Sequence, residues 1–262
     1  HPTHIIFPGQ PILRYHSASP FFIHPNLTPA YPLVDRDQIV TLRFLQSHSL
    51  KLFQSHGEKR MKLYYARNSR AVRVAWLLEE LELSYEIESF ELGSPDMRSD
   101  TYRALHPMGR VPTLVDGDIT LFESGAIIQY LLAKYGNGRF IPDVNSGAFA
   151  AYLQWFHYAE GMIMPPMNTI VVETILLPPE RRNEVNVKRA TKLLGQMLTS
   201  VEQQLAGKTF LLGEHLSAAD FMTGHAVIMA KRLGADFSDK PNLRQYSEHL
   251  SQRPAFQTAS SL

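Results

Sequence analysis

A change in hydrophobic periodicity between residues 136 and 148 sets the organisation of this chain. From Met61 to this change, short stretches of alternating polarity are interleaved with helical stretches. From Ala148 on, every convincing segment repeats its apolar residues with the helical period of about 3.6. The pattern predicts an α/β domain followed by an all-α domain.

The α/β part is predicted to have the element order β-α-β-α-β-β-α, with Asp116-Gly117-Asp118 as the turn between the last two strands. Its strands are expected at 62–66, 85–92, 113–115 and 120–122. Its helices are expected at 67–83, 101–107 and 124–136, and Arg70 and Arg73 are expected to lie away from the apolar face of the first of them. In the all-α part, helices are expected at 148–172, 180–205, 217–233 and 241–250. The predicted domains are therefore 61–138 and 148–262.

The helix expected at 217–233 has a well-defined start. Ser217 stands at the N-cap with Asp220 three residues on, which is a short-side-chain version of the capping box. Leu216 and Phe221 have the spacing of a hydrophobic staple. From this pattern alone, loss of the cap is expected to cost about 1 kcal/mol.

Composition excludes several kinds of chemistry. The 262 residues include no cysteine, which excludes disulfides, thiolate metal ligands and a cysteine nucleophile. No apolar run reaches the roughly 18 residues that a membrane-spanning helix needs. The formal net charge is +1, and no basic stripe argues for nucleic acid. Neither nucleic acid nor a membrane is expected as a partner.

Residues 1–60 are predicted to be an extended, disordered extension. They hold seven of the 17 prolines, and proline disrupts both helix interiors and central strands. Three origins are considered: a transit peptide, a native arm, or translated upstream or expression-derived sequence ahead of a native start at Met61. The third hypothesis is favoured because Met61 is the first methionine. Gly57-Glu58 can also be encoded by a bacterial ribosome-binding sequence, which the codons would test.

Motifs in both domains resemble those of the cytosolic glutathione S-transferase family. The relevant stretches are "HPMGRVPTL" (106–114), "FESGAI" (122–127) and "LSAADF" (216–221). Two further stretches, "NSRAVRVAWLLEEL" (68–81) and "FHYAEGMIMPPM" (156–167), are similar to a bacterial and fungal branch with Asn-Ser-Arg at the first helix. The resemblance runs from residue 61 to about residue 255. It implies a thioredoxin-like first domain and an all-helical second domain.

The resemblance also implies a glutathione site. A cis Val111-Pro112 bond would leave the backbone of Val111 free to pair with a tripeptide, although trans is the commoner state of proline. Ser124 at a helix N-terminus suits a carboxylate, and Glu123 suits an ammonium group. Arg110 is placed to meet the carboxylate of glutathione's glycine. A simple N-cap serine, an exposed glutamate and a solvated arginine stay open as alternative readings of these residues.

Ser69 is predicted to stabilise the glutathione thiolate. A free thiol has a pKa of about 8.5 and is only about 3 % ionised at pH 7, so a site must lower this pKa. Hydrogen bonds and a helix N-terminus can do so, and Ser69 stands at or next to a helix start. Asn68 and Arg70 are supporting candidates. Tyr65 on the first strand is the chief rival, since some branches of the family use a strand tyrosine.

The helix at 148–172 is implied to face an apolar electrophile. Methionine and aromatic side chains usually indicate core, but methionines also form adaptable binding surfaces. The residues expected to line a hydrophobic substrate pocket are Phe156, Tyr158, Met162 and Met164. His157 and Glu160 are spaced to meet on one helix face, and such a pair is more often structural. Two residues make no metal site, and no metal is expected.

The predicted function is that of a cytoplasmic glutathione S-transferase, with glutathione as co-substrate and a small apolar electrophile as second substrate. A homodimer is implied by the resemblance. The location would be mitochondrial if residues 1–60 are a transit segment. Two alternatives are kept: a non-catalytic glutathione-binding or regulatory module, and an enzyme for glutathione-dependent peroxide reduction or ether cleavage.

Overall fold

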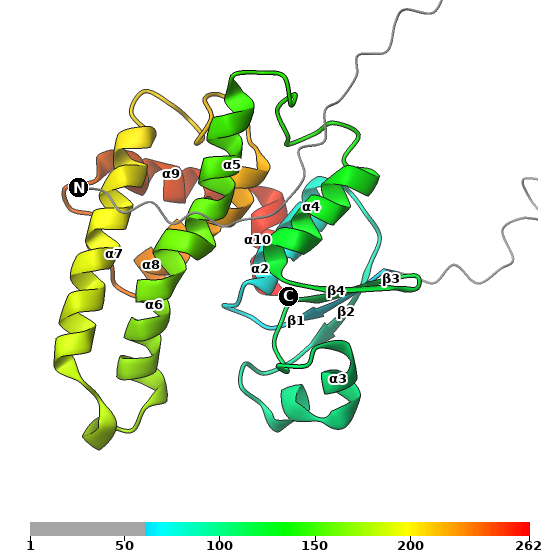
Figure 1. Ribbon diagram of the computed structural model, residues 1–262. Coiled ribbons are helices and arrows are strands. Elements are labelled where there is room, and N and C mark those ends of the chain that lie inside the picture. The colour runs from blue at the N-terminus through cyan, green and yellow to red at the C-terminus, as the bar shows by residue number, and fades with distance from the viewer. Residues whose placement is uncertain (1–60) are drawn as a thin grey trace, which may run out of the picture. The chain divides into compact units, whose positions relative to one another are not determined.

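A four-stranded mixed sheet forms the first half of the described protein. The computed structural model describes residues 61–262 (Figure 1), so the predictions for residues 1–60 lie outside the described residues. The strands are β1 (Lys62–Tyr65), β2 (Glu86–Ser89), β3 (Thr113–Asp116) and β4 (Ile119–Phe122). Their order is β2-β1-β3-β4, with β1 parallel to β2 and antiparallel to β3, and β3 antiparallel to β4. All four predicted strands are confirmed.

Helices cover both faces of this sheet. The helices are α2 (Ala71–Glu80), α3 (Asp100–Leu105) and α4 (Ser124–Tyr135). In Figure 1, α2 and α4 lie together on one side of the sheet and α3 lies on the other. Alternation along β1 explains this, because Leu63 and Tyr65 are fully buried while the ring of Tyr64 packs 5.2 Å from that of Tyr102 in α3. The predicted β-α-β-α-β-β-α order is confirmed, with an additional 3-10 turn at Pro95–Arg98.

The first helix begins later than the sequence predicts. Residues 67–70 form a turn, in which Asn68 has a left-handed φ of 55°, and α2 starts only at Ala71. Asparagine tolerates this conformation better than most residues do. The turn therefore places Ser69 before the helix rather than inside it.

The second half is entirely helical apart from its connections. A nearly continuous helical stretch comprises α5 (Ala148–Tyr158), a π-helical turn (Ala159–Ile163), α6 (Met164–Val171) and a second π-helical turn (Val172–Leu176). The later helices are α7 (Glu184–Gln204), α8 (His225–Arg232), α9 (Pro241–Ser251) and α10 (Pro254–Ser261). A third π-helical turn, Asp220–Gly224, leads directly into α8. The helix α10 was not predicted.

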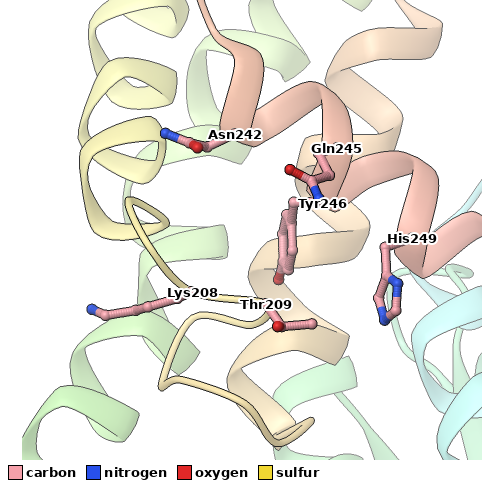
Figure 2. Close-up of a pocket in the computed structure, with 6 residues that line it drawn as sticks. All are labelled: Lys208, Thr209, Asn242, Gln245, Tyr246 and His249. Atoms are coloured by element: carbon pink, nitrogen blue, oxygen red, sulfur yellow. The ribbon is translucent and has the colours of Figure 1, made fainter.

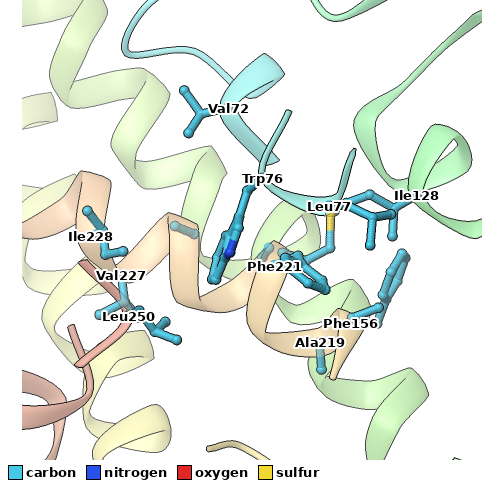
Figure 3. Packing of buried hydrophobic residues seen from close by; sticks show 14 of the residues in the cluster. Val72, Trp76, Leu77, Ile128, Phe156, Ala219, Phe221, Val227, Ile228 and Leu250 are labelled. Atoms are coloured by element: carbon cyan, nitrogen blue, oxygen red, sulfur yellow. The ribbon is translucent and has the colours of Figure 1, made fainter. Parts of the chain in front are cut away.

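Trp76 of α2 joins the two halves in one hydrophobic core. Its fully buried ring meets Phe221 edge-on with centroids 4.6 Å apart (Figure 3). It also meets Phe256 of α10 edge-on, at 5.1 Å. Aromatic pairs in this arrangement are favourable beyond their buried area. The position of α2 is thus fixed from both the sheet and the helical half. No helix in residues 61–262 is long and apolar enough to cross a membrane.

The contacts of Ser217 confirm one of the two hydrogen bonds of the predicted capping box, the one from its backbone N–H to the side chain of Asp220. The carboxylate of Asp220 accepts from the backbone N–H and the hydroxyl of Ser217, both at 2.8 Å. The serine hydroxyl therefore donates to Asp220 instead of accepting from a helix N–H. The other carboxylate oxygen accepts from the N–H of Leu211 at 2.9 Å and the hydroxyl of Tyr246 at 2.8 Å. Asp220 is fully buried and joins three segments of the helical half.

Candidate active site

The turn before α2 holds Ser69 in a defined orientation. Its Oγ donates to the carbonyl of Ala66 at 2.6 Å and accepts from the N–H of Ala71 at 3.1 Å. Among the described residues, nothing accepts from the backbone N–H groups of Ser69 and Arg70. A half-buried hydroxyl and two unpaired N–H groups are thus gathered at the positive end of α2.

Tyr65 is directed into the core. The side chain is fully buried, and its hydroxyl donates to the carbonyl of Ala259 in α10 at 2.8 Å. Burial raises the pKa of Tyr65. The hydroxyl is therefore already used to attach α10 to the sheet, and this placement favours Ser69 over Tyr65 as the group that meets a ligand.

Arginines tie the Ser69 turn to the helical half. Asn68 is exposed, and its side-chain oxygen accepts from Nη1 of Arg232 at 3.1 Å. Arg67 donates from Nε to the carbonyl of Leu262 at 2.9 Å, and from Nη2 to the carbonyl of Ser261. The turn is thus held by long-range contacts on either side of Ser69.

An ionic cluster, buried at Arg73 and partly exposed at Arg70 and Glu160, adjoins this turn. Arg73 of α2 is fully buried, and its Nη1 donates to Oε1 of Glu160 at 2.5 Å and to Oγ of Ser124 at 3.2 Å. Nε of Arg73 donates to Nδ1 of His225 at 3.2 Å. Arg70 donates from Nε to both carboxylate oxygens of Glu160, at 2.9 and 3.0 Å. The cluster joins α2, the start of α4, the first π-helical turn and the start of α8.

Two sequence expectations are corrected by this cluster. Arg73 was expected to lie away from the apolar face of its helix, and it is buried instead. Glu160 meets two arginines rather than His157, which is exposed. The burial of Arg73 could have been anticipated from its position between Val72 and Val74 in an otherwise apolar run. His225 gave no comparable signal in the sequence.

The charges of the cluster follow from its contacts. Burial favours the neutral acid of Glu160, but its contacts with Arg70 and Arg73 outweigh this and hold the pKa below its ordinary value. Burial, with the nearby positive charge of Arg73, Arg232 and Arg70, holds the pKa of His225 well below its ordinary value. Near neutral pH, Glu160 is therefore ionised and His225 is neutral.

The acid stability of the protein is expected to depend on Glu160. Since its folded-state pKa is lowered, its contribution is complete above its unfolded-state pKa and is lost as the pH falls through the folded-state value. Glu160→Gln is expected to cost about 1 kcal/mol of unfolding free energy at pH 7, because solvent screens a carboxylate whose side chain is 37 % exposed. The difference in unfolding free energy between the wild-type protein and Glu160→Gln should become smaller progressively below about pH 5. Urea unfolding of both proteins from pH 3 to pH 7 measures it, and a gap independent of pH would contradict the assignment. His225 is common to both proteins, so its own titration largely cancels.

The predicted cis-proline corner is confirmed. The Val111-Pro112 peptide bond is cis, and the pairing of β3 with β1 begins only at Thr113, so Val111 lies outside the ladder. Gly109 in the preceding turn has a φ of +57°, and an added Cβ would lie 2.2 Å from the carbonyl oxygen of Met97. This position therefore requires glycine. The side chain of Arg110 is exposed, and its carbonyl accepts from the hydroxyl of Tyr102 at 2.5 Å.

The start of α4 brings Ser124 to the cluster and leaves Glu123, the residue before it, exposed. Glu123 is exposed and has a φ of 74°, a conformation that costs a non-glycine residue free energy and is frequent at functional sites. Ser124 is 3 % exposed and is the first residue of α4. Ser124 Oγ and Glu160 Oε1 are bonded to the same nitrogen of Arg73. The carboxyl-binding and thiol-binding candidates are thus linked through α2.

The four residues expected to line a hydrophobic pocket have different environments. Phe156 and Met164 are buried in the core, with 1 % and 8 % exposure. The hydroxyl of Tyr158 donates to the carbonyl of Met197 at 3.0 Å. Met162, at 42 % exposure, presents the most surface of the four. The pocket itself stays a prediction.

A separate polar pocket lies among the later helices. Figure 2 shows the residues that line it: Lys208, Thr209, Asn242, Gln245, Tyr246 and His249. Several of these groups already have structural partners, since Tyr246 donates to Asp220 and Asn242 donates to Glu202. None of the predicted site residues lines it. Within residues 61–262, no group of three or more His, Asp or Glu side chains is arranged to hold a metal ion.

A thioredoxin-like sheet domain, with a serine before its first helix and a cis-proline corner, is joined here to an all-helical domain. Comparison with known proteins identifies the family that shares this architecture. The family models described as "Glutathione S-transferase, N-terminal domain" and "Glutathione S-transferase, C-terminal domain" match residues 59–133 and 163–254.

Three known proteins illustrate the similarity. Glutathione S-transferase 4 of Zea mays is 33 % identical over 193 residues, which are 70 % of this chain and 83 % of the relative. Glutathione S-transferase 3 of Schizosaccharomyces pombe is 29 % identical over 212 residues, covering 76 % and 86 %. The crystal structure of a Burkholderia graminis glutathione transferase, with two glutathione molecules bound per subunit, is 27 % identical with a TM-score of 0.69, covering 80 % and 91 %.

The chain belongs to the glutathione S-transferase family. The predicted family, fold class and enzyme class, glutathione transferase, are therefore confirmed. The narrower assignment to a branch with an Asn-Ser-Arg motif stays a prediction.

Proposed function

We propose that this chain binds glutathione next to Ser69, stabilises it as the thiolate, and directs the sulfur to a small apolar electrophile. The observation that carries the proposal is the arrangement at the start of α2. A half-buried serine hydroxyl and two unpaired N–H groups lie at the positive end of a helix. Hydrogen bonds to a thiolate at such a position lower its pKa.

The chemistry needs little else from the protein. The thiol loses its proton to solvent, and a lone pair of the thiolate forms a carbon–sulfur bond. In a substitution, the leaving group departs with its bonding electrons. The protein contributes thiolate stabilisation and the positioning of the two substrates.

The remainder of the tripeptide would lie between the cis-proline corner and α4. Val111 offers backbone groups outside the β-ladder, and Arg110 offers an exposed guanidinium to a terminal carboxylate. Glu123 would pair with the ammonium of the γ-glutamyl group, and the α4 N-terminus at Ser124 would bind its carboxylate. Pro112 fixes the corner. The glutathione bound in the Burkholderia graminis relative supports this ligand.

Asn68 and Arg70 would support the Ser69 turn. Asn68 provides the left-handed residue of the turn, and Arg70 links it to Glu160. We assign the electrophile pocket to the surface around Met162 and Tyr158, with Phe156 and Met164 behind it. The thioredoxin-like domain would comprise residues 61–138 and the helical domain residues 148–262.

The wider setting proposed is a cytoplasmic homodimer with a role in detoxification. The family resemblance implies the dimer, and the described chain exposes large apolar side chains on both halves. They include Met108, Ile119 and Phe122 in the sheet half, and Ile175, Leu176 and Val185 in the helical half. Light scattering of the full chain would test the dimer.

Thiolate absorbance of glutathione bound to the full chain, followed from pH 5 to pH 9, tests the proposed function. The expected result is a thiol pKa about two units below its solution value, together with turnover of an aryl halide. Binding without a pKa shift or turnover would favour a non-catalytic module. A lowered pKa with turnover of a hydroperoxide, but not of the aryl halide, would favour peroxide reduction.

A further inference from the structure

Arg73 determines in which direction the hydroxyl of Ser124 can form further hydrogen bonds. Nη1 of Arg73 donates to Glu160 Oε1 at 2.5 Å and to Ser124 Oγ at 3.2 Å, with the sulfur of Met222 as a weaker acceptor at 4.0 Å. Ser124 Oγ therefore accepts a hydrogen bond from the guanidinium. Its own hydrogen must point elsewhere, and within residues 61–262 it has no acceptor. The serine is thus left as a donor at the first turn of α4.

We infer that Arg73 is a positioning residue that orients the Ser124 hydroxyl as a hydrogen-bond donor to the α-carboxylate of the γ-glutamyl group. The inference rests on the proposed function, because it concerns the same glutathione site. Arg73 is fully buried and acts only through Ser124. Since Ser124 is 3 % exposed, a ligand that reaches its hydroxyl must sit directly on the N-terminus of α4.

The composition of the cluster argues against a purely stabilising role. A buried ion pair is often no more stabilising than apolar residues of similar volume. Moreover, Nη2 of Arg73 and Nε2 of His225 are buried without an acceptor among the described residues. Unpaired buried donors cost free energy. The arginine therefore does more at this position than a leucine or methionine would.

Local backbone geometry points to the same site. Glu160 lies in the first π-helical turn, 159–163, and the third π-helical turn, 220–224, directly precedes His225. π-Helical turns are rare in proteins overall, and those that occur are often found at functional sites. Both turns are used here to bring a side chain to Arg73.

A double-mutant cycle with two ligands tests the inference. The proteins are the full chain and its Arg73→Met, Ser124→Ala and doubly substituted variants, with Arg73→Lys as the conservative change. The ligands are glutathione and 4-aminobutanoyl-cysteinyl-glycine, which keeps the ammonium group but lacks the α-carboxylate. Calorimetry gives Kd for each combination.

Arg73→Met is expected to weaken glutathione binding about tenfold. It should leave the Kd of the analogue unchanged within about twofold, and add nothing in the Ser124→Ala background. Arg73→Lys should recover part of the loss, since lysine keeps a donor but not the forked geometry. If Arg73→Met weakened the binding of both ligands equally, Arg73 would be merely structural and the inference would be overturned. The same would follow if the losses of glutathione affinity in Arg73→Met and Ser124→Ala were additive in the double variant.

Arg253 provides a matched control. It forms a second arginine–carboxylate pair with α2, donating to Glu80 at 2.7 and 2.9 Å, away from Ser124. Arg253→Met should lower the unfolding temperature without changing either Kd. If Arg73→Met does not fold, Arg73→Lys with the two ligands decides the question by the same criterion. If the wild-type chain bound neither ligand, the proposed function would be rejected. If the wild-type chain bound glutathione but Arg73→Met lost the same affinity for both ligands, only the present inference would be rejected.

Discussion

Replacing Ser69 by alanine is expected to raise the thiol pKa of bound glutathione by up to two units, toward its solution value of about 8.5. A loss of two pKa units corresponds to about 2.7 kcal/mol and to a roughly hundredfold lower ratio of thiolate to thiol. Transfer to an aryl halide near neutral pH should fall by about 10²-fold, as when one preorganised donor to a developing anion is removed. Thiolate absorbance and initial rates on the same samples measure both effects.

The expected size follows from the contacts of Ser69. Without ligand, its hydroxyl donates to the neutral carbonyl of Ala66, and it accepts from Ala71. A thiolate is a charged acceptor, and hydrogen bonds with a charged partner are about twice as strong as neutral ones. Rotation of the hydroxyl hydrogen from Ala66 to sulfur is therefore favourable only for the ionised ligand. This preference lowers the thiol pKa further than the N–H groups at the start of α2 do by themselves.

Tyr65→Phe is the matched control for this experiment. It removes a hydroxyl that donates to Ala259 and leaves that carbonyl buried without its partner. The variant should lose about 1 kcal/mol of stability while the thiol pKa stays lowered. A pKa that rises in Tyr65→Phe but not in Ser69→Ala would move the role to the tyrosine.

Local sequence signals predicted the parts of the fold that local interactions determine. The hairpin turn after Asp116 and the contact between Ser217 and Asp220 agree with the structure, whereas the cis bond before Pro112 was implied by the family resemblance. The turn and the Ser217–Asp220 contact each depend on only a few residues that are neighbours in the sequence. The late start of α2 was missed because Asn68 occupies a left-handed turn that its residue type permits but does not require.

Parts that depend on distant contacts could not be predicted. Arg73 is buried because Glu160 lies beside it in space, although it is 87 residues away in the sequence. The helix α10 has few apolar residues, and its place is fixed by the packing of Phe256 on Trp76. The burial of Phe156 also needed the structure, because an aromatic and methionine pattern is the same for core and pocket.

Asp220→Ala is expected to be the most destabilising substitution considered for this protein, at about 4 kcal/mol. A simple helix cap would be worth about 1 kcal/mol. The carboxylate of Asp220, however, accepts four hydrogen bonds in a fully buried position. Truncation would leave the N–H groups of Leu211 and Ser217 and the hydroxyl of Tyr246 without their acceptor. Each such buried donor costs about 1–3 kcal/mol, partly relieved by relaxation.

Two further variants separate the buried network from capping in general. Asn183 caps α7 by accepting from the N–H groups of Val185 and Asn186 at an exposed position, so Asn183→Ala should cost only about 1 kcal/mol. Asp220→Asn keeps the shape but turns an amide toward a donor, and should fall between the two. Urea unfolding at pH 7 gives all three values.

The consequence of Asp220→Ala should extend to the candidate site. Asp220 begins the π-helical turn that ends immediately before His225, and His225 meets Arg73 at 3.2 Å. Loosening this turn releases one side of the arginine that contacts Ser124. Glutathione binding should therefore weaken in Asp220→Ala even where the chain remains folded, and should be unchanged in Asn183→Ala. If Asp220→Ala cost no more stability than Asn183→Ala, the buried network would be worth no more than an ordinary cap.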